Sequence, residues 1–259
     1  MTFYETLQFL SLRKCLSMRV AVISDIHGNY EAFKQVLADI GETGVDAEFC
    51  LGDIVGYGPE PEASVLRSRR EGIPAVIGNH ELGLTSERYM SSMNEIARRS
   101  LVITKTLLSA ESIQYLLALP LTMSAYGARF VHGCPPASAT IYLFDPEEHM
   151  LKKLFSTFVE DICFVGHTHN LALFGFDGDR VSKEGLTQGI VELNPDSRYI
   201  VNVGSVGQPR DRQNNNAKYV IWDSERNTIE VRFVPYDVAV TADKIIELGF
   251  PEFNAIRLW

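Results

Sequence analysis

The sequence has little cysteine and no segment apolar enough to cross a bilayer. Only four of its 259 residues are cysteine, and no two form a Cys-x-x-Cys pair. This excludes a disulfide scaffold, argues against a zinc ribbon and favours reduced thiols in the cytoplasm. No window of about 18 uncharged apolar residues occurs, so we expect no membrane-spanning helix. Basic residues do not cluster, and acidic residues outnumber them by 33 to 24, which argues against binding to duplex nucleic acid.

A linker and an internal repeat are also absent, so the length suits one large domain. With 46% hydrophobic and 22% charged residues, the composition is that of a globular protein. Residues 1–17 show no clear period, and their charges are in the wrong order for a secretory signal. We expect residues 1–17 to be a dispensable N-terminal extension and residues 18–259 to be one domain. The apolar character of the extension leaves open a helix packed on the domain or on a second copy in a homo-oligomer.

The part that follows alternates apolar runs with helical patterns. Runs at residues 20–23, 47–51 and 73–77 predict buried strands, and Asn29 can cap a helix that ends at Gly41. Residues 84–119 predict a helical insertion that Pro120 ends. Further strands are expected near 128–131, 162–165, 199–203, 219–222 and 229–234, before a last helix at 241–248. The pattern indicates an α/β protein with two sheets packed face to face and helices outside.

Histidine is concentrated where these runs end. Five of the six histidines follow an apolar run, beside glycine and in company with Asp or Asn; they are His27, His80, His132, His167 and His169. Ligands gather outside the carboxyl ends of strands in open α/β sheets, so these side chains should meet in space. Oxygen and nitrogen donors without thiolate suit Mn, Fe, Zn or Co. We expect His149 at the surface and Cys50, Cys134 and Cys163 as small packing residues.

Taken in order, the motifs resemble one family. They are Asp25-x-His27, Gly52-Asp53, Gly78-Asn79-His80-Glu81, His132-Gly133 and Gly166-His167-x-His169. Together they are similar to the calcineurin-like metallophosphoesterase superfamily. The segment Asn202-Val203-Gly204-Ser205-Val206-Gly207-Gln208-Pro209-Arg210-Asp211 is similar to a compact prokaryotic branch of small phosphodiesterase-like proteins.

The resemblance implies a four-layer αββα sandwich of two mixed β-sheets with two divalent metal ions. Manganese is the first expectation, with Fe, Zn, Co, Ni and Mg as alternatives. One metal would be held by Asp25, His27 and His169, the other by Asn79, His132 and His167, and Asp53 would bridge both. The implied reaction is hydrolysis of a phosphodiester or phosphomonoester in a small phosphorylated substrate, by hydroxide held between the metals. Asn79 would steady the phosphate oxygens, and His80 would protonate the leaving oxygen or stabilise its charge.

Several alternatives remain open at this point. His80 could have a positioning role alone, and Arg210 could contact phosphate or pair with Asp211. The segment 204–207 could be a tight turn or a substrate-facing loop. The stretch 54–59 replaces the Asp-Arg-Gly pattern of Ser/Thr protein phosphatases and symmetrical diadenosine tetraphosphatases, which weakens both of those functions. A binding scaffold with a decayed site is disfavoured because every motif residue is intact.

Overall fold

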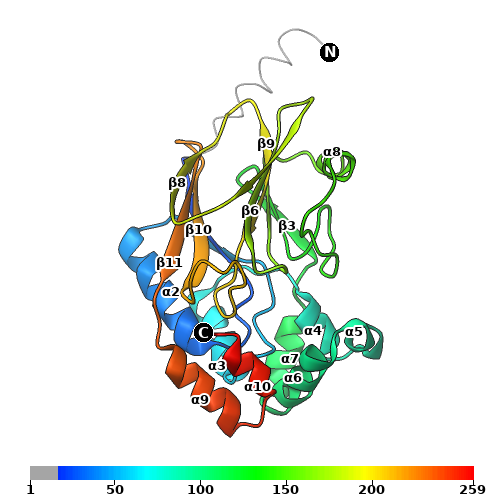
Figure 1. The fold of residues 1–259 in the computed structure, drawn as a ribbon, viewed down its shortest axis with the longest axis vertical. Helices are drawn as coiled ribbons and strands as arrows, with labels where there is room; N and C mark the ends of the chain where they lie inside the picture. Colours follow the sequence, from blue (N-terminus) through cyan, green and yellow to red (C-terminus); the bar gives the residue numbers. More distant parts are fainter. Residues whose placement is uncertain (1–16) are drawn as a thin grey trace.

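Residues 17–259 are described in the computed structural model of the protein (Figure 1). The expected N-terminal extension therefore lies almost wholly outside the described residues, and its dispensability stays a prediction. Two mixed β-sheets form the centre of the domain, as expected. Within the described part of the chain, no helix combines the length and apolar character that crossing a membrane requires.

The first sheet joins strands from both ends of the chain. In spatial order they are β2 (Ala47–Cys50), β1 (Arg19–Ile23), β10 (Ala217–Asp223), β11 (Thr228–Val234) and β8 (Gly189–Glu192). Only the β1–β2 pair is parallel; β10 and β11 are antiparallel to their neighbours. Strands from the first and last thirds of the chain therefore lie side by side in this sheet.

The second sheet has three parallel strands at its centre. In spatial order its strands are β3 (Thr122–Ala125), β4 (Ala128–Val131), β5 (Ile162–Val165), β9 (Arg198–Val203), β6 (Leu171–Phe176) and β7 (Val181–Gly185). The parallel pairs are β4–β5 and β5–β9. Their carboxyl ends therefore open on the same edge, where the histidine motifs follow β4 and β5.

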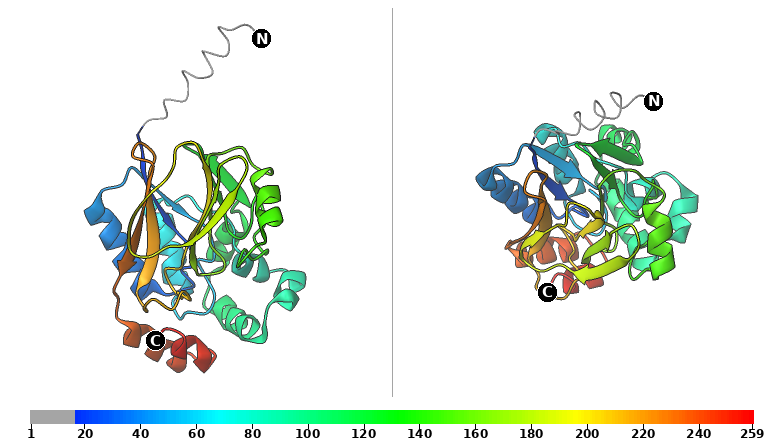
Figure 2. Two further views of the ribbon diagram at one scale, coloured as in Figure 1. Left: turned by 45° about the horizontal axis from the view of Figure 1, so that its top comes forward. Right: turned by 90° about the horizontal axis from the view of Figure 1, so that it is seen from above.

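The two sheets pack face to face with helices on both outer sides (Figure 2). Strand β1 shows why: Val20 and Val22 face the core between the sheets, whereas Ala21 and Ile23 face α2 (Tyr30–Thr43). Apolar side chains on both faces bury both sides of the strand. On the other outer face, α8 (Glu148–Phe155) packs Leu151 and Phe155 against the second sheet. These layers confirm the αββα sandwich.

The remaining helices gather at one end of the sandwich (Figure 1). The helical insertion is confirmed, because its helices follow one another without a strand: α4 (Asn79–Gly83), α5 (Glu87–Ser92), α6 (Glu95–Thr106) and α7 (Ala110–Leu117). Helix α3 (Pro61–Glu71) lies beside α2 and α7. The chain ends in α9 (Val238–Glu247) and α10 (Glu252–Ile256), which share an apolar cluster with Ile103 and Leu107 of the insertion.

Two local expectations need correction. The run Ile73–Ile77 is not a strand: one bridge joins Ala75 to Cys50. Pro74 has no N–H to donate, which limits this run to a short edge contact. Helix α2 begins after Asn29, whose side chain accepts a hydrogen bond from Ala32 N, but it continues past Gly41 to Thr43. A helix ends where the chain turns away, and here that turn is at Gly44, with φ 67°.

We expect Asp39→Asn to loosen α2 from the first sheet. Asp39 accepts hydrogen bonds from Tyr219 Oη at 2.6 Å and from Arg232 Nε and Nη2 at 3.0 and 2.6 Å. The substitution should lower the free energy of unfolding by about 1 to 2 kcal/mol, since these bonds are charge-assisted but partly exposed. Denaturant unfolding at pH 7 measures this.

The ion pair between Asp39 and Arg232 should make the free energy of unfolding depend on pH. Burial by itself raises the pKa of Asp39, but the hydrogen bonds from Arg232 and Tyr219 have the larger combined effect and lower this pKa below its usual value. Because the pKa of Asp39 is lower in the folded protein than in the unfolded chain, its ionised carboxylate stabilises the fold. This stabilisation is fully present above the pKa of the unfolded chain and is lost as the pH falls through the pKa of the folded protein. The difference between wild type and Asp39→Asn should therefore shrink in acid. A constant difference down to pH 2 would contradict this.

Candidate metal centre

The loops that follow five apolar segments converge at one end of the sandwich and bring the sequence-predicted side chains together. These loops come after β1, β2, the edge segment at 73–77, β4 and β5. The residues are Asp25, His27, Asp53, Asn79, His80, His132, His167 and His169, and all are buried. A buried set of carboxylates and imidazoles is costly unless each group finds a partner.

The backbone of this region is strained. Five of these residues have a left-handed conformation: Asp25 (φ 54°), His27 (φ 51°), Asp53 (φ 49°), His167 (φ 65°) and His169 (φ 61°). Side chains other than glycine rarely adopt such angles, and each costs of order 1 to 3 kcal/mol. Strain of this kind persists where the surrounding structure holds side chains for a task, so its concentration here marks a functional site.

The first group of donor atoms comes from the loops after β1 and β5. His27 Nε2 lies 3.1 Å from His169 Nε2. The Asp25 carboxylate completes the group, with Oδ1 at 3.2 Å from His169 Nε2 and 3.6 Å from His27 Nε2. The structure thus brings together the three residues expected for one metal.

The second group is centred on His132. Its Nε2 lies 3.1 Å from His167 Nδ1 and 3.2 Å from both Asn79 Oδ1 and Asp53 Oδ2. Asp53 Oδ2 is also 3.8 Å from His27 Nε2 of the first group. One carboxylate oxygen therefore lies between the two groups.

Backbone carbonyls fix which ring nitrogen of three histidines faces the centre. Nδ1 of His27 donates to Val55 O at 3.0 Å, Nδ1 of His132 to Leu51 O at 2.7 Å, and Nδ1 of His169 to Gln208 O at 2.6 Å. With the proton on Nδ1, each Nε2 keeps its lone pair toward the centre. This arrangement is typical of metal-binding histidines.

The donor atoms fit divalent cations. Asp25 Oδ1 is buried without a hydrogen-bond partner, and the Nε2 atoms of His27 and His169 that face it carry lone pairs because each ring has its proton on Nδ1. Burial lowers the pKa of His169 to about 4, so its ring is neutral. At His132 burial opposes protonation, but the Asp53 carboxylate raises the pKa to about 9. A cation beside Asp53 would satisfy the same negative charge and compete with that proton.

Comparison with known proteins gives the family. The family model of the calcineurin-like phosphoesterase superfamily domain matches residues 18–227. The chain belongs to this superfamily. An uncharacterized protein of Methanocaldococcus jannaschii is 35% identical over 250 residues, covering 93% of this chain and 97% of that protein.

Solved structures agree with the family. The crystal structure of a metallophosphoesterase from Sphaerobacter thermophilus is 35% identical, with a TM-score of 0.81 over 94% of this chain and 98% of that one. A hypothetical protein from Pyrococcus horikoshii OT3 shares the fold, at 20% identity and a TM-score of 0.74 over 93% of this chain and 97% of its own. The chain is thus a metallophosphoesterase, and the family uses divalent metals.

A buried glutamate supports the phosphoesterase site, and the sequence analysis assigned it no role. Glu81 accepts hydrogen bonds from the backbone N–H groups of Gly78 (2.8 Å), Asp53 (2.9 Å) and Val55 (3.2 Å). Burial and then the Asp53 charge raise the pKa of Glu81 to about 7. The sequence signal that could have pointed to this role is the position of Glu81 directly after Gly78-Asn79-His80. Through these hydrogen bonds Glu81 connects the loop after β2 with the loop before α4.

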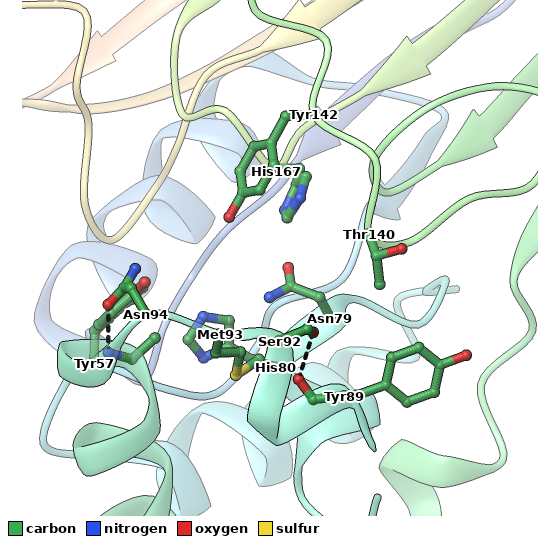
Figure 3. A pocket seen from close by; sticks show the side chains of 11 residues that line it. Tyr57, Asn79, His80, Tyr89, Ser92, Met93, Asn94, Thr140, Tyr142 and His167 are labelled. Carbon is green, nitrogen blue, oxygen red and sulfur yellow. Dashed lines mark hydrogen bonds between the residues drawn. The ribbon is translucent and has the colours of Figure 1, made fainter. Parts of the chain in front are cut away.

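An open cavity of about 280 Å³ lies beside the phosphoesterase centre (Figure 3). Asn79, His80 and His167 line this cavity, and the insertion contributes further lining residues that include Tyr89. Tyr142, about half exposed, stacks on the His167 ring with centroids 3.6 Å apart. Sequence reasoning missed this contact, because the loop that carries Tyr142 has no motif. The cavity gives a substrate access to the donor groups.

Arg210 lies next to the first donor group. Its backbone N–H donates to His169 O at 3.2 Å, and its Nη2 donates to Gln208 Oε1 at 2.8 Å. The alternative pairing of Arg210 with Asp211 is wrong, because Asp211 pairs with Lys218 at 3.2 Å.

The neighbouring segment 204–207 is buried, so it is not a substrate-facing loop. Ser205 Oγ donates to Asp25 O at 2.9 Å, and Asn29 Nδ2 donates to Gly207 O at 2.9 Å. The segment therefore braces the loop that carries Asp25. Elsewhere, His149 is exposed and Cys50, Cys134 and Cys163 are buried and free, as expected.

We expect Gly56→Ala to displace His80. Gly56 has φ 95°, and an added methyl group would lie 2.9 Å from His80 Cε1 and closer still to Nδ1. Phosphoesterase turnover should fall roughly 10²-fold, the scale of misplacing a reacting group by about 1 Å. Steady-state kinetics measures this. The control is Gly41→Ala, where a methyl group meets nothing within 4 Å. Unchanged turnover in Gly56→Ala would show that the His80 position is not critical.

Proposed function

We propose that this phosphoesterase is a dinuclear metal enzyme that hydrolyses phosphodiester or phosphomonoester bonds. The observation that carries the proposal is the position of Asp53 Oδ2, 3.2 Å from His132 Nε2 in one donor group and 3.8 Å from His27 Nε2 in the other. A single carboxylate shared by two donor groups suits a pair of cations. A lone structural ion would need only one group.

The proposed metal ligands follow the two groups. Asp25, His27 and His169 would hold one ion, Asn79, His132 and His167 the other, and Asp53 would bridge them. When bound, two divalent cations supply positive charge for the phosphate and lower the pKa of a water between them. The acidic chain otherwise carries a net charge of −9, so this charge matters for anion binding.

Three side chains would act on the substrate itself. The Asn79 amide would donate a hydrogen bond to a phosphate oxygen, and the Arg210 guanidinium would contact the phosphate from the side of His169. His80 would protonate the leaving oxygen or stabilise its charge. Burial lowers the pKa of His80 to about 3, which favours the neutral ring as a hydrogen-bond donor over proton release by an imidazolium. His80 N donates to Asp53 Oδ1 at 2.9 Å, which orients its loop.

We further propose that the resident ions are manganese and that residues 18–259 form the single catalytic domain of a cytoplasmic enzyme. Carboxylate, amide and imidazole donors suit Mn, and Fe, Zn, Co, Ni and Mg fit the same donor types. The buried free cysteines are consistent with a reducing compartment. The substrate would be a small phosphorylated molecule that enters through the open cavity.

A substrate panel tests the function. Aryl phosphodiesters, aryl phosphomonoesters and a phosphopeptide are incubated with protein that is metal-free or supplied with Mn, Mg, Co or Zn. We expect metal-dependent hydrolysis of at least one ester. Phosphopeptide turnover above that of the small esters would favour a protein phosphatase. Absence of turnover with every metal would favour a binding scaffold and overturn the proposal.

A further inference from the structure

A second cavity, of about 550 Å³, lies beside the metal centre and is lined by arginines. Its polar lining comes from the loop after the site segment 204–207 and from the last residues of the chain: Arg210, Arg212, Asn214, Asn215 and Arg257. Trp259, which is 72% exposed, adds an aromatic face. Figure 1 shows the C-terminal helix α10 at the end of the molecule that holds the insertion helices.

The guanidinium groups in this cavity lack carboxylate partners. Among residues 17–259, no ion pair involves Arg210, Arg212 or Arg257. The nearby carboxylate of Asp211 forms an ion pair with Lys218 instead. Arg210 Nε is buried without a hydrogen-bond partner. Burial and then the Arg210 charge lower the pKa of Arg257, so the two cations repel one another. The chain as a whole has a net charge of −9, so a local group of arginines without acidic partners is suited to binding an anion.

The cavity adjoins the proposed metal ligands. The Arg210 backbone is bonded to His169 O, and its guanidinium lies 5.8 Å from the ring centre of Tyr57, which in turn packs on the ring of His27 at 4.7 Å. Leu258 lines this cavity and also a small cavity that His27 and Tyr57 line. Arg210 therefore contacts a proposed metal ligand, His169, through its backbone and also lines the arginine cavity.

We propose that the arginine cavity binds a second anionic group of the substrate, so that the enzyme selects phosphoesters that carry a further phosphate. This inference rests on the proposed function, because the first phosphate would lie at the metal centre. Arg210 would lie between the two anionic groups, and Arg212 and Arg257 would hold the second one. Asn214 and Asn215 offer amide donors to its oxygens. Guanidinium groups suit phosphate because their N–H donors match pairs of its oxygens.

The test is an equilibrium binding measurement on the full chain loaded with manganese. Calorimetry compares methylenebisphosphonate, which has two anionic groups and cannot be hydrolysed, with methylphosphonate, which has one. We expect the wild type to prefer the bisphosphonate at least tenfold, the scale of charge-assisted hydrogen bonds. Arg257→Gln and Arg212→Gln should each reduce that preference several-fold, and the double variant should reduce it close to the value for one anionic group.

Arg226→Gln is the matched control, because this arginine is exposed in the turn between β10 and β11, at the opposite end of β10 from the loop that lines the cavity. Its preference should equal that of the wild type. A preference that survives the double variant would overturn the inference, since both anionic groups would then bind at the metals. The binding measurement does not depend on turnover, so inactivity toward every ester would count against the proposed function alone.

Discussion

Replacing Asp53 by Asn should abolish phosphoesterase activity and empty at least one metal site. The carboxylate lies between the two donor groups, and its negative charge would offset the repulsion of the two proposed cations. An amide keeps one oxygen, but it loses the charge and turns N–H donors toward His132 or His27. Turnover should fall roughly 10³-fold or more, at or above the effect of removing one electrostatic donor. Metal analysis of the purified variant, with kinetics in added manganese, measures both effects.

The matched control for this change is Asp39→Asn, which makes the same chemical replacement on α2, outside the site. It should keep both metals and its turnover while losing some stability. Two bound metals with unimpaired turnover in Asp53→Asn would end the bridging assignment. A fall in metal content to one ion, with activity lost, is the expected result.

Replacing His80 by Ala should leave the metal content unchanged and lower turnover by about 10²- to 10⁴-fold, which is the usual contribution of general acid catalysis. The His80 ring packs beside His27 and Tyr57, with ring centroids 4.8 and 4.6 Å away, but it belongs to neither set of proposed metal ligands. The loss should shrink for nitrophenyl esters, because a good leaving group needs little help. Rates with nitrophenyl and alkyl esters, together with metal analysis, measure this.

His149→Ala is the control for His80→Ala, since His149 is exposed on α8. It should leave kinetics and metal content unchanged. An equal loss for nitrophenyl and alkyl leaving groups in His80→Ala would show that His80 acts by positioning.

Much of the fold could be predicted because short-range patterns repeat along the chain. Strand β1 is an apolar run with both faces buried, and the predicted runs 128–131 and 162–165 coincide with β4 and β5. The run at 73–77 is also apolar but forms only one bridge, because Pro74 has no N–H to donate to a neighbouring strand.

The sequence by itself determined the chemistry of the centre. Each predicted ligand follows closely on an apolar run, so the local pattern is enough to place it where such a run ends. Carboxylate, amide and imidazole donors at five such ends indicate divalent metals, and the resemblance of the motifs to the metallophosphoesterases implies a phosphate substrate. The left-handed backbone at Asp25 and Asp53 is the local cost of aiming these side chains at one point.

Only the tertiary structure decided how distant segments meet. It pairs β1 with β10, directs Glu81 onto the backbone N–H groups of Asp53 and Val55, stacks Tyr142 on His167 and brings Arg257 beside Arg210. None of these contacts has a local signature, because each joins segments whose separation along the chain is unrelated to their distance in space. Register between strands and packing of helices fix such contacts, and both depend on the whole core rather than on any one motif.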